Sequence, residues 1–251
     1  MNNITLLQCE KITKKFGGLS ALKEIDLTIM SGEILGLIGP NGSGKTTLIN
    51  IITGVYKPDS GKILYHGEDI TKLRPDQICK KGIARTFQIP RPFPQLTALD
   101  NVVIGFLFAG SVKKIKIAKK KAMDILEFIG FPPQYYEVKA EKLTTVQIKK
   151  LELARALATN PELLLLDEFF AGLTEIEIEE AIELIKRLYE KKITLLVIEH
   201  IIRVIMNLCH RIVVLHQGEK IAEGSPREIS SNDRVIEAYL GEIYHRGETL
   251  S

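Results

Sequence analysis

Short runs of apolar residues, each bounded by charged or turn-forming residues, recur along the chain and define its expected architecture. Three of these runs are almost continuously apolar and lie at 34–38, 163–166 and 193–198. Such runs are typical of strands that are buried on both faces, as in parallel sheets covered by helices. Helical periodicity follows two of them, at 48–52 and 175–190. The pattern therefore predicts an α/β fold with a mixed, mostly parallel sheet.

The first 70 residues carry a different pattern. β-forming residues at 4–9 and 24–29 are separated by a turn at 14–18 that contains two glycines. A short strand is expected at 62–65, directly after the turn at 58–61. We therefore expect a small antiparallel β subdomain within this stretch.

The character of the chain changes after residue 89. Prolines at positions 90, 92 and 94 mark a loop, and no clear strand follows before residue 160. Helical patterns cover 98–108, 115–129 and 144–159. We expect residues 90–159 to form a helical subdomain inserted into a core made of residues 1–89 and 160–251. The remaining expected elements are helices at 75–81, 200–208, 226–230 and 232–240, and strands at 83–87, 211–216 and 219–223.

Composition narrows the class of protein. The chain has 251 residues, 45% of them apolar, which supports a sizeable core. Its 34 basic and 31 acidic residues are nearly balanced, so we expect no nucleic-acid partner. The longest apolar run, at 102–109, is too short to cross a bilayer, which needs about 20 residues. Any membrane role is therefore expected to come through a partner.

A glycine-rich segment at 39–47 separates the first buried strand from the first helical pattern. This is the context in which a G-x-x-x-x-G-K-[ST] loop binds phosphate: backbone N–H groups and the helix N-terminus point at the phosphate oxygens. Lys45 would reach the terminal phosphates, and the Thr46 hydroxyl would bind Mg²⁺. The predicted nucleotide-binding residues are Gly39, Asn41, Gly42, Ser43, Gly44, Lys45, Thr46 and Thr47. The sequence thus predicts a nucleoside triphosphate site.

Two carboxylates end the second buried strand. Placing Asp167 and Glu168 after four leucines is costly unless they have a task. Beside a phosphate loop, Asp167 is expected to hold Mg²⁺ through water, and Glu168 to act as the base that polarises the attacking water. The alternative is a strand that ends in solvent with two ordinary surface acids.

Two further polar residues are expected at the same edge of the sheet. His200 follows the third buried strand, where it is expected to contact the γ-phosphate. Gln88 follows the strand at 83–87, where its amide would touch both Mg²⁺ and the attacking water. Neither residue carries the argument alone, because a single histidine or glutamine at a strand end is more often structural.

Taken in this order, the phosphate loop, Gln88, the Asp167–Glu168 strand end and His200 resemble the nucleotide-binding subunit of an ABC transporter. The resemblance extends over nearly the whole chain and is closer to the ATP-binding subunits of branched-chain (hydrophobic) amino-acid uptake systems. The segments that carry this narrower resemblance are 85–88, 93–97, 151–157, 171–173, 198–200, 221–224 and 235–241.

The resemblance implies a head-to-tail dimer with two ATP molecules in its interface, each held between the phosphate loop of one subunit and the signature motif of the other. Phe16 matches the aromatic position that stacks on adenine. Thr144 and Gln147, in the signature motif, would contact the partner's ATP. The resemblance also implies a polytopic membrane permease that contacts the helical subdomain and the Gln88 loop, and a location on the cytoplasmic face of the cell membrane.

The signature motif departs from the family pattern. Where Leu-Ser-Gly-Gly-Gln or Leu-Ser-Tyr-Gly-Gln is usual, residues 143–147 read Leu-Thr-Thr-Val-Gln. Val146 adds bulk and resists positive φ where a glycine normally allows close approach of a backbone N–H. We therefore expect this motif to support hydrolysis poorly. Phe169 and Thr174 also stand where proline and Asn or Asp are usual.

The residues that serve the chain's own ATP are thus intact, whereas those that serve a partner's ATP are altered. We interpret this asymmetry as a heterodimer, in which a second subunit with an intact signature completes this chain's site. A working homodimer that tolerates the altered motif is the alternative. Two other functions stay open: a nucleotide-binding subunit with little turnover, and an ABC-type ATPase that is not a transporter.

Overall fold

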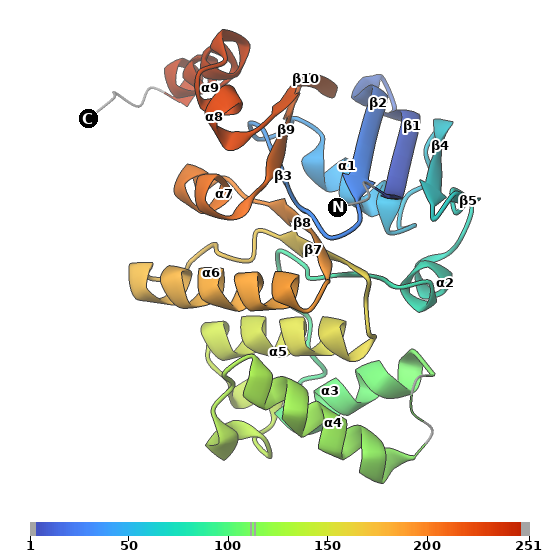
Figure 1. The fold of residues 1–251 in the computed structure, drawn as a ribbon, viewed down its shortest axis with the longest axis vertical. Helices are drawn as coiled ribbons and strands as arrows, with labels where there is room; N and C mark the ends of the chain where they lie inside the picture. The colour runs from blue at the N-terminus through green and yellow to red at the C-terminus, as the bar shows by residue number, and fades with distance from the viewer. Residues whose placement is uncertain (1–3, 111, 113, 247–251) are drawn as a thin grey trace.

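The computed structural model describes residues 4–110, 112 and 114–246, with 240–246 described by their backbone. Within these residues the strands form one antiparallel sheet and one mostly parallel sheet. Figure 1 shows the two sheets side by side and a group of helices, α3 to α5, at the opposite end of the molecule. The predicted α/β class is confirmed.

The larger sheet has the strand order β10-β9-β3-β8-β7-β6. Only the β9–β10 pair is antiparallel among its described pairings, as the hairpin signal predicted. All residues of β3, β7 and β8 are buried, in agreement with their continuous apolar runs. The strands are β3 (Ile34–Ile38), β6 (Ile83–Arg85), β7 (Leu163–Asp167), β8 (Thr194–Ile198), β9 (Arg211–His216) and β10 (Glu219–Gly224).

The register of the parallel strands brings their carboxyl ends level. Leu37 of β3 pairs with Ile198 of β8, and Ile198 pairs with Asp167 of β7. The segments that follow these three strands therefore leave the sheet at the same edge. They are the glycine-rich loop, the turn that begins at Glu168, and the Glu199–His200 segment.

The smaller sheet has the order β2-β1-β4-β5 and consists of β1 (Thr5–Phe16), β2 (Leu19–Met30), β4 (Ser60–Tyr65) and β5 (Glu68–Asp69). β1 and β2 are longer than predicted, since they continue through the charged residues at 10–15 and 23–24. These residues lie on a partly exposed face, where β-bulges shift the register and charge costs little. The prediction ended the first strand at residue 9 and began the second at residue 24, and so made both strands too short.

Helices cover both faces of the larger sheet. α1 (Lys45–Ile52) packs with the smaller sheet against one face, where Leu163, Leu165 and Leu196 contribute to the core. The opposite face, with Leu164 and Leu166, packs against a second set of helices. Alternate leucines of β7 thus enter opposite cores, as the two-residue period of a strand requires. The other helices of the core are α2 (Pro75–Lys80), α6 (Glu175–Glu190), α7 (Ile202–Leu208), α8 (Pro226–Ser230) and α9 (Asp233–Arg246).

Residues 90–159 are helical, and no strand occurs in their described part. α3 (Ala98–Phe108), α4 (Ile115–Phe128) and α5 (Thr145–Ala158) match the predicted ranges closely, with short 3-10 turns at Pro133–Tyr135 and Ala140–Lys142. Their buried side chains belong to the same apolar cluster as α6 and one face of the sheet. The division into a core of 1–89 and 160–251 and a helical subdomain of 90–159 stays a prediction, because one continuous core joins them.

Close packing of α3 on α5 depends on Gly105. A Cβ atom there would lie 2.8 Å from both the Ala158 Cβ and the Arg155 carbonyl oxygen. We expect Gly105→Val to lower the free energy of unfolding by about 1–3 kcal/mol, because overpacking forces the helices apart. Urea unfolding followed by circular dichroism measures this. Leu107→Val on the same helix, at a 41% exposed position, is the control, with an expected change of no more than about 0.5 kcal/mol. Equal losses in both variants would contradict this account.

Candidate functional site

A cleft of about 670 Å³ lies between the β1–β2 turn, the glycine-rich loop and the turn after β7. Each predicted nucleotide-binding residue except Gly39 lines it, as do the predicted catalytic residues Gln88 and Glu168. Residues that the sequence did not suggest complete the lining: Leu19, Ser20, Ala21, Lys23 and Gln217. The folded chain therefore brings five separate segments to one cleft.

The glycine-rich loop has a backbone that side chains would prevent. At Gly39, a Cβ atom would lie 2.1 Å from the Leu215 carbonyl oxygen, and at Gly44 it would lie 2.6 Å from that of Ala21. Both residues have positive φ, at 150° and 106°. Gly44 precedes α1 without a side-chain cap, so the first N–H groups of the helix are directed at the cleft. A helix N-terminus of this kind suits a phosphate group.

Lys45 is 8% exposed and its ammonium group contacts the loop itself. Nζ donates to the carbonyl oxygens of Gly39 at 2.6 Å and Pro40 at 2.9 Å. The loop is therefore curled around the ammonium group. A phosphate that enters the cleft would meet this charge at the base of the loop, and the carbonyl contacts would be exchanged for phosphate contacts.

Asp167 forms a buried ion pair that sequence analysis missed. Its Oδ2 lies 3.0 Å from Nη2 of Arg85, and both side chains are less than a tenth exposed. Burial raises the pKa of Asp167, and the Arg85 guanidinium counteracts that rise. Arg85 also donates to the Asn50 side chain of α1 at 2.7 Å. Asp167 is thus held in place by a group from the next strand.

Glu168 and Gln88 contact each other across the cleft. Gln88 Nε2 donates to Glu168 Oε2 at 2.6 Å. Glu168 has φ of 50°, a left-handed conformation that non-glycine residues seldom adopt and that marks functional turns. β6 ends at Arg85 and not at residue 87 as expected, so Gln88 lies on the loop three residues beyond the strand. Gln88 and Glu168 nevertheless both lie at the cleft, and their direct contact was not predicted.

The three predicted Mg²⁺ ligands share a second cavity of about 960 Å³ beside the cleft. Thr46, Gln88 and Asp167 all line it, and they offer hydroxyl, amide and carboxylate oxygens. In the described residues, no cluster of three or more His, Cys, Asp or Glu side chains has metal-binding geometry. Mg²⁺ nevertheless fits such a site, because it usually keeps several waters and binds substrate phosphates with one or two protein ligands.

The two residues after β8 differ in their location: Glu199 is buried, and His200 is exposed. Glu199 is 1% exposed, and its Oε1 accepts a hydrogen bond from the Phe170 N–H at 2.8 Å. Burial raises the pKa of Glu199 to about 7. The His200 side chain is 60% exposed and, within the described chain, does not line the cleft. His200 therefore stands at the predicted edge of the sheet but is not brought to Glu168.

The signature segment begins α5. Thr144 is the N-cap: its hydroxyl accepts from the Gln147 N–H, and its own N–H donates to the Gln147 side chain. Thr145 and Val146 lie in the first helical turn, whose backbone is right-handed. The expectation that Val146 opposes a required positive φ is therefore wrong, since the helix needs no such conformation there. The branched Val146 side chain still adds bulk at this position, so weak support of hydrolysis by this motif stays a prediction.

Phe16 lies at the mouth of the cleft, 44% exposed, with its ring edge-on to Tyr56 at a centroid distance of 5.4 Å. Nζ of Lys14 lies over the ring, 5.6 Å from its centroid, and stacking of the ring on adenine stays a prediction. Three polar residues near the site escaped the sequence analysis: Arg85, Lys149 and Glu199. Each is a charged residue at a position that periodicity assigns to the interior, and that conflict is the signal by which they could have been found.

Two protein families match the sequence of this chain. The family described as ABC transporter matches residues 22–171, and the one described as Branched-chain amino acid ATP-binding cassette transporter matches residues 219–245. Within the described residues, no helix has both the length and the apolar character that a bilayer crossing needs.

Full-length relatives agree with the family match. The chain is 36% identical to the probable branched-chain amino acid transport ATP-binding protein LivG of Methanocaldococcus jannaschii, over 96% of this chain and 99% of that protein. It is 39% identical to the high-affinity LivG protein of Escherichia coli K12, over 94% and 98%.

Solved structures have the same fold. A cassette of an ABC transporter in its ADP conformation is 35% identical and superposes with a TM-score of 0.85, over 95% of this chain and 99% of that one. A dimeric cassette in a post-hydrolysis state, bound to ADP and Pi, is 31% identical with a TM-score of 0.81, over 88% and 99%. The chain therefore belongs to the ABC transporter family, among the ATP-binding subunits that hydrolyse ATP to drive transport.

Proposed function

We propose that this chain is the ATP-hydrolysing subunit of an importer for branched-chain amino acids. One observation carries the hydrolytic part: the Glu168–Gln88 pair faces the same cleft as the glycine-rich loop and Lys45. The cargo is inferred from the matched C-terminal family segment and from the names of the LivG relatives. The cargo itself would be selected by membrane and binding-protein partners.

Hydrolysis would proceed by in-line attack of water on the γ-phosphate, with most of the catalysis coming from positioning and charge neutralisation. Lys45 and the N–H groups of the loop would neutralise the phosphate oxygens. Glu168, which Gln88 orients, would align the water and accept its proton. His200 would have to approach the γ-phosphate when two subunits close on each other, because its side chain is 60% exposed and does not line the cleft described in the single chain.

Mg²⁺ would be held by the Thr46 hydroxyl and the Gln88 amide oxygen directly, and by Asp167 through water. When bound, it would neutralise charge on the β- and γ-phosphates. Arg85 would keep the Asp167 carboxylate ionised and aimed at this position, which explains why a buried ion pair stands here.

We infer the partners from the family to which the chain belongs. A second ATP-binding subunit would place its signature motif over this chain's ATP, and Thr144 and Gln147 would serve the partner's ATP. We favour a heterodimer, because Val146 brings a branched side chain to a position that must approach a phosphate closely. The permease would dock against α2, the Gln88 loop and α3, which line the same cavity of about 960 Å³ as the predicted Mg²⁺ ligands. Exposed apolar side chains gather there, among them Phe87, Ile89 and Phe108.

The role of Glu168 can be tested by Glu168→Gln. We expect ATP binding to persist and kcat to fall by about 10²–10⁴-fold, because the amide cannot accept a proton. Steady-state phosphate release and equilibrium nucleotide binding measure the two quantities. Glu190→Gln, at an exposed position on α6, is the control and should leave both unchanged. Undiminished turnover in Glu168→Gln would refute the assignment.

The altered signature can be tested in the isolated chain, where each site can only use this chain's own motif. We expect Val146→Gly to raise kcat by about tenfold or more, because the backbone then reaches the phosphate without a branched side chain in between. The gain should vanish in the Val146→Gly, Glu168→Gln double variant. If Val146→Gly leaves turnover unchanged, side-chain bulk does not limit the motif and the case for a heterodimer is lost.

The permease surface can be tested with neighbouring residues of α3. Phe108 is 47% exposed and lines the cavity, whereas Leu107 is 41% exposed and does not. Phe108→Ser should weaken co-purification with the permease by about tenfold, because it removes an apolar anchor. Leu107→Ser should have little effect, and both variants should keep the ATPase rate of the isolated chain. Equal retention of the permease by both variants would contradict this docking site.

A further inference from the structure

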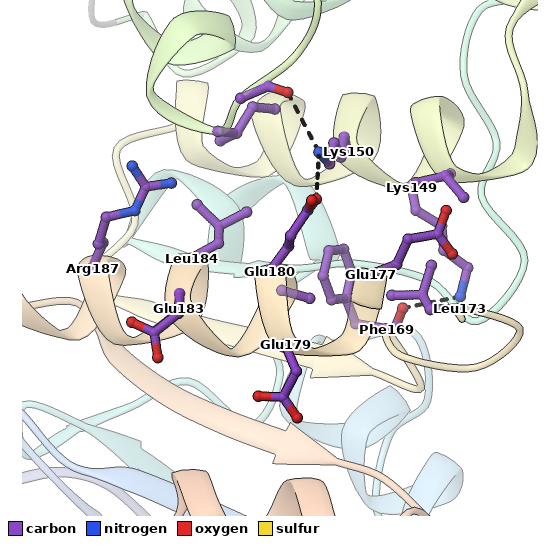
Figure 2. Close-up of a pocket in the computed structure, with 14 residues that line it drawn as sticks. Lys149, Lys150, Phe169, Leu173, Glu177, Glu179, Glu180, Glu183, Leu184 and Arg187 are labelled. Atoms are coloured by element: carbon purple, nitrogen blue, oxygen red, sulfur yellow. Dashed lines mark hydrogen bonds and ion pairs between the residues drawn. The ribbon is translucent and has the colours of Figure 1, made fainter. Parts of the chain in front are cut away.

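Lys149 of α5 places a charged group in the interior, against the turn that carries Glu168. The residue is 8% exposed, and its Nζ donates to the carbonyl oxygens of Ala171 at 2.5 Å and Phe169 at 3.0 Å. The carbonyl oxygen of Glu168 itself lies 3.4 Å away. Figure 2 shows the side chain reaching from α5 down to this turn, beside Phe169 and Leu173.

The ammonium group matches the turn chemically. It has three donors, and the turn presents three carbonyl oxygens to one point. Carbonyl dipoles that converge in this way repel one another unless a cation lies between them. Burial lowers the pKa of Lys149, so the site has a desolvation cost that only these contacts and nearby carboxylates offset. A lysine that only packed its aliphatic chain on α5 would not need three carbonyl oxygens around its ammonium group.

Glu199 holds the same turn from the other side. Its Oε1 accepts the Phe170 N–H, so the turn has its carbonyl groups bound by a cation and an N–H bound by an anion. Glu199 is also the first among the carboxylates that favour the charged form of Lys149. The second oxygen of Glu199 has no hydrogen-bond partner in the described chain. That oxygen, Oε2, lies 4.0 Å from Nδ1 of His200, and the charge of Lys149 favours the ionised form of Glu199.

The strained conformation of Glu168 gives this turn its importance. A glutamate with φ of 50° keeps that conformation only where its surroundings impose it. Lys149 contacts the carbonyl groups of Glu168 and of the next residue, so it acts on the backbone that aims the carboxylate. On α5, Lys149 lies two residues after Gln147 and five after Thr144, within about 8 Å along the helix axis.

We propose that Lys149 is a positioning residue that couples the signature end of α5 to Glu168 of the same subunit. The proposal rests on the function proposed above, in which Thr144 and Gln147 meet the partner's ATP. A shift of the α5 N-terminus on that contact would move the ammonium group and, with it, the three carbonyl groups. Each ATP site of the dimer would be formed by the phosphate loop of one subunit and the signature motif of the other. ATP bound at one site would thus control the orientation of Glu168 in the other site.

The first test compares Lys149→Met with Lys150→Met in the full-length chain. Lys150 is the matched control, since it lies next to Lys149 but points to Glu180 and the Gly130 carbonyl oxygen (Figure 2). We expect Lys149→Met to lower kcat by about 10- to 100-fold through misalignment of the base, with KM for ATP changed no more than about twofold. Lys150→Met should stay within about twofold of the wild type in both. Unchanged kcat in Lys149→Met, or an equal loss in Lys150→Met, would overturn the proposal.

Conservative variants separate positioning from loss of fold. Lys149→Arg keeps the charge with different donor geometry, and we expect it to recover kcat to within about tenfold of the wild type. Lys149→Gln keeps two donors without the charge and should lie between Arg and Met. Urea unfolding verifies that the compared variants are folded, and if Lys149→Met is not, the Arg and Gln variants decide. A variant that binds ATP weakly but turns over normally would contradict a positioning role.

The coupling has its own test in a double-variant cycle with Gln147→Ala. Gln147→Ala alone should lower kcat, both by loss of its own contact with the partner's ATP and through Lys149. In the Lys149→Met background only the direct part should remain, so the combined loss should be smaller than the product of the two single losses. Multiplicative effects, or no effect of Gln147→Ala, would reject the coupling. Glu168→Gln distinguishes failure of the coupling from failure of the proposed function. If Glu168→Gln abolishes hydrolysis while Lys149→Met does not change it, the coupling fails and the proposed function stands.

Discussion

The parallel register of three buried strands is the constraint on which the site depends. Leu37, Ile198 and Asp167 lie in one row across β3, β8 and β7, so the segments after them emerge side by side. These segments are the glycine-rich loop, the turn that begins at Glu168 and the Glu199–His200 segment, and they can act together only because they leave the sheet at one edge. A slip of one residue in a strand would turn its side chains to the opposite face and separate the groups. The apolar cores on both faces of the sheet oppose such a slip.

At this edge of the sheet, charged side chains of the site form contacts within the protein that a bound substrate can replace. Lys45 binds carbonyl oxygens of its own loop, and Gln88 binds the carboxylate of Glu168. Both contacts are short: the first uses the ammonium group that phosphate would bind, and the second uses the Glu168 carboxylate that would bind the attacking water. The contacts of Asp167 with Arg85 are different, because the pair is buried and Arg85 is also tied to α1. The site thus combines fixed charges with exchangeable ones, as a nucleotide site that opens and closes needs.

Much of this arrangement could be predicted from the sequence. The uniform apolar runs at 34–38 and 163–166 indicated buried strands, and the glycine spacing after the first run indicated the phosphate loop. What could not be predicted was set by contacts between distant segments. The length of β1 and β2 depends on pairing through charged residues, and the pair of Arg85 with Asp167 depends on neighbouring strands. The backbone of Val146 was predicted wrongly, because the family glycine at this position was taken to require positive φ. In fact α5 begins at Thr145, so Val146 is already helical.

The buried charges around the turn after β7 form one electrostatic unit. Arg85 and Asp167 lie before it, Lys149 lies on one side, and Glu199 lies on the other. Each would be costly alone in an apolar interior, and an apolar replacement of a whole set is often at least as stable. Stability therefore does not explain their presence. The turn must hold Glu168 in a left-handed conformation and must also respond to α5, which would contact a second subunit. Directional polar contacts, such as hydrogen bonds, can meet both requirements. Apolar packing would supply cohesion there without that direction.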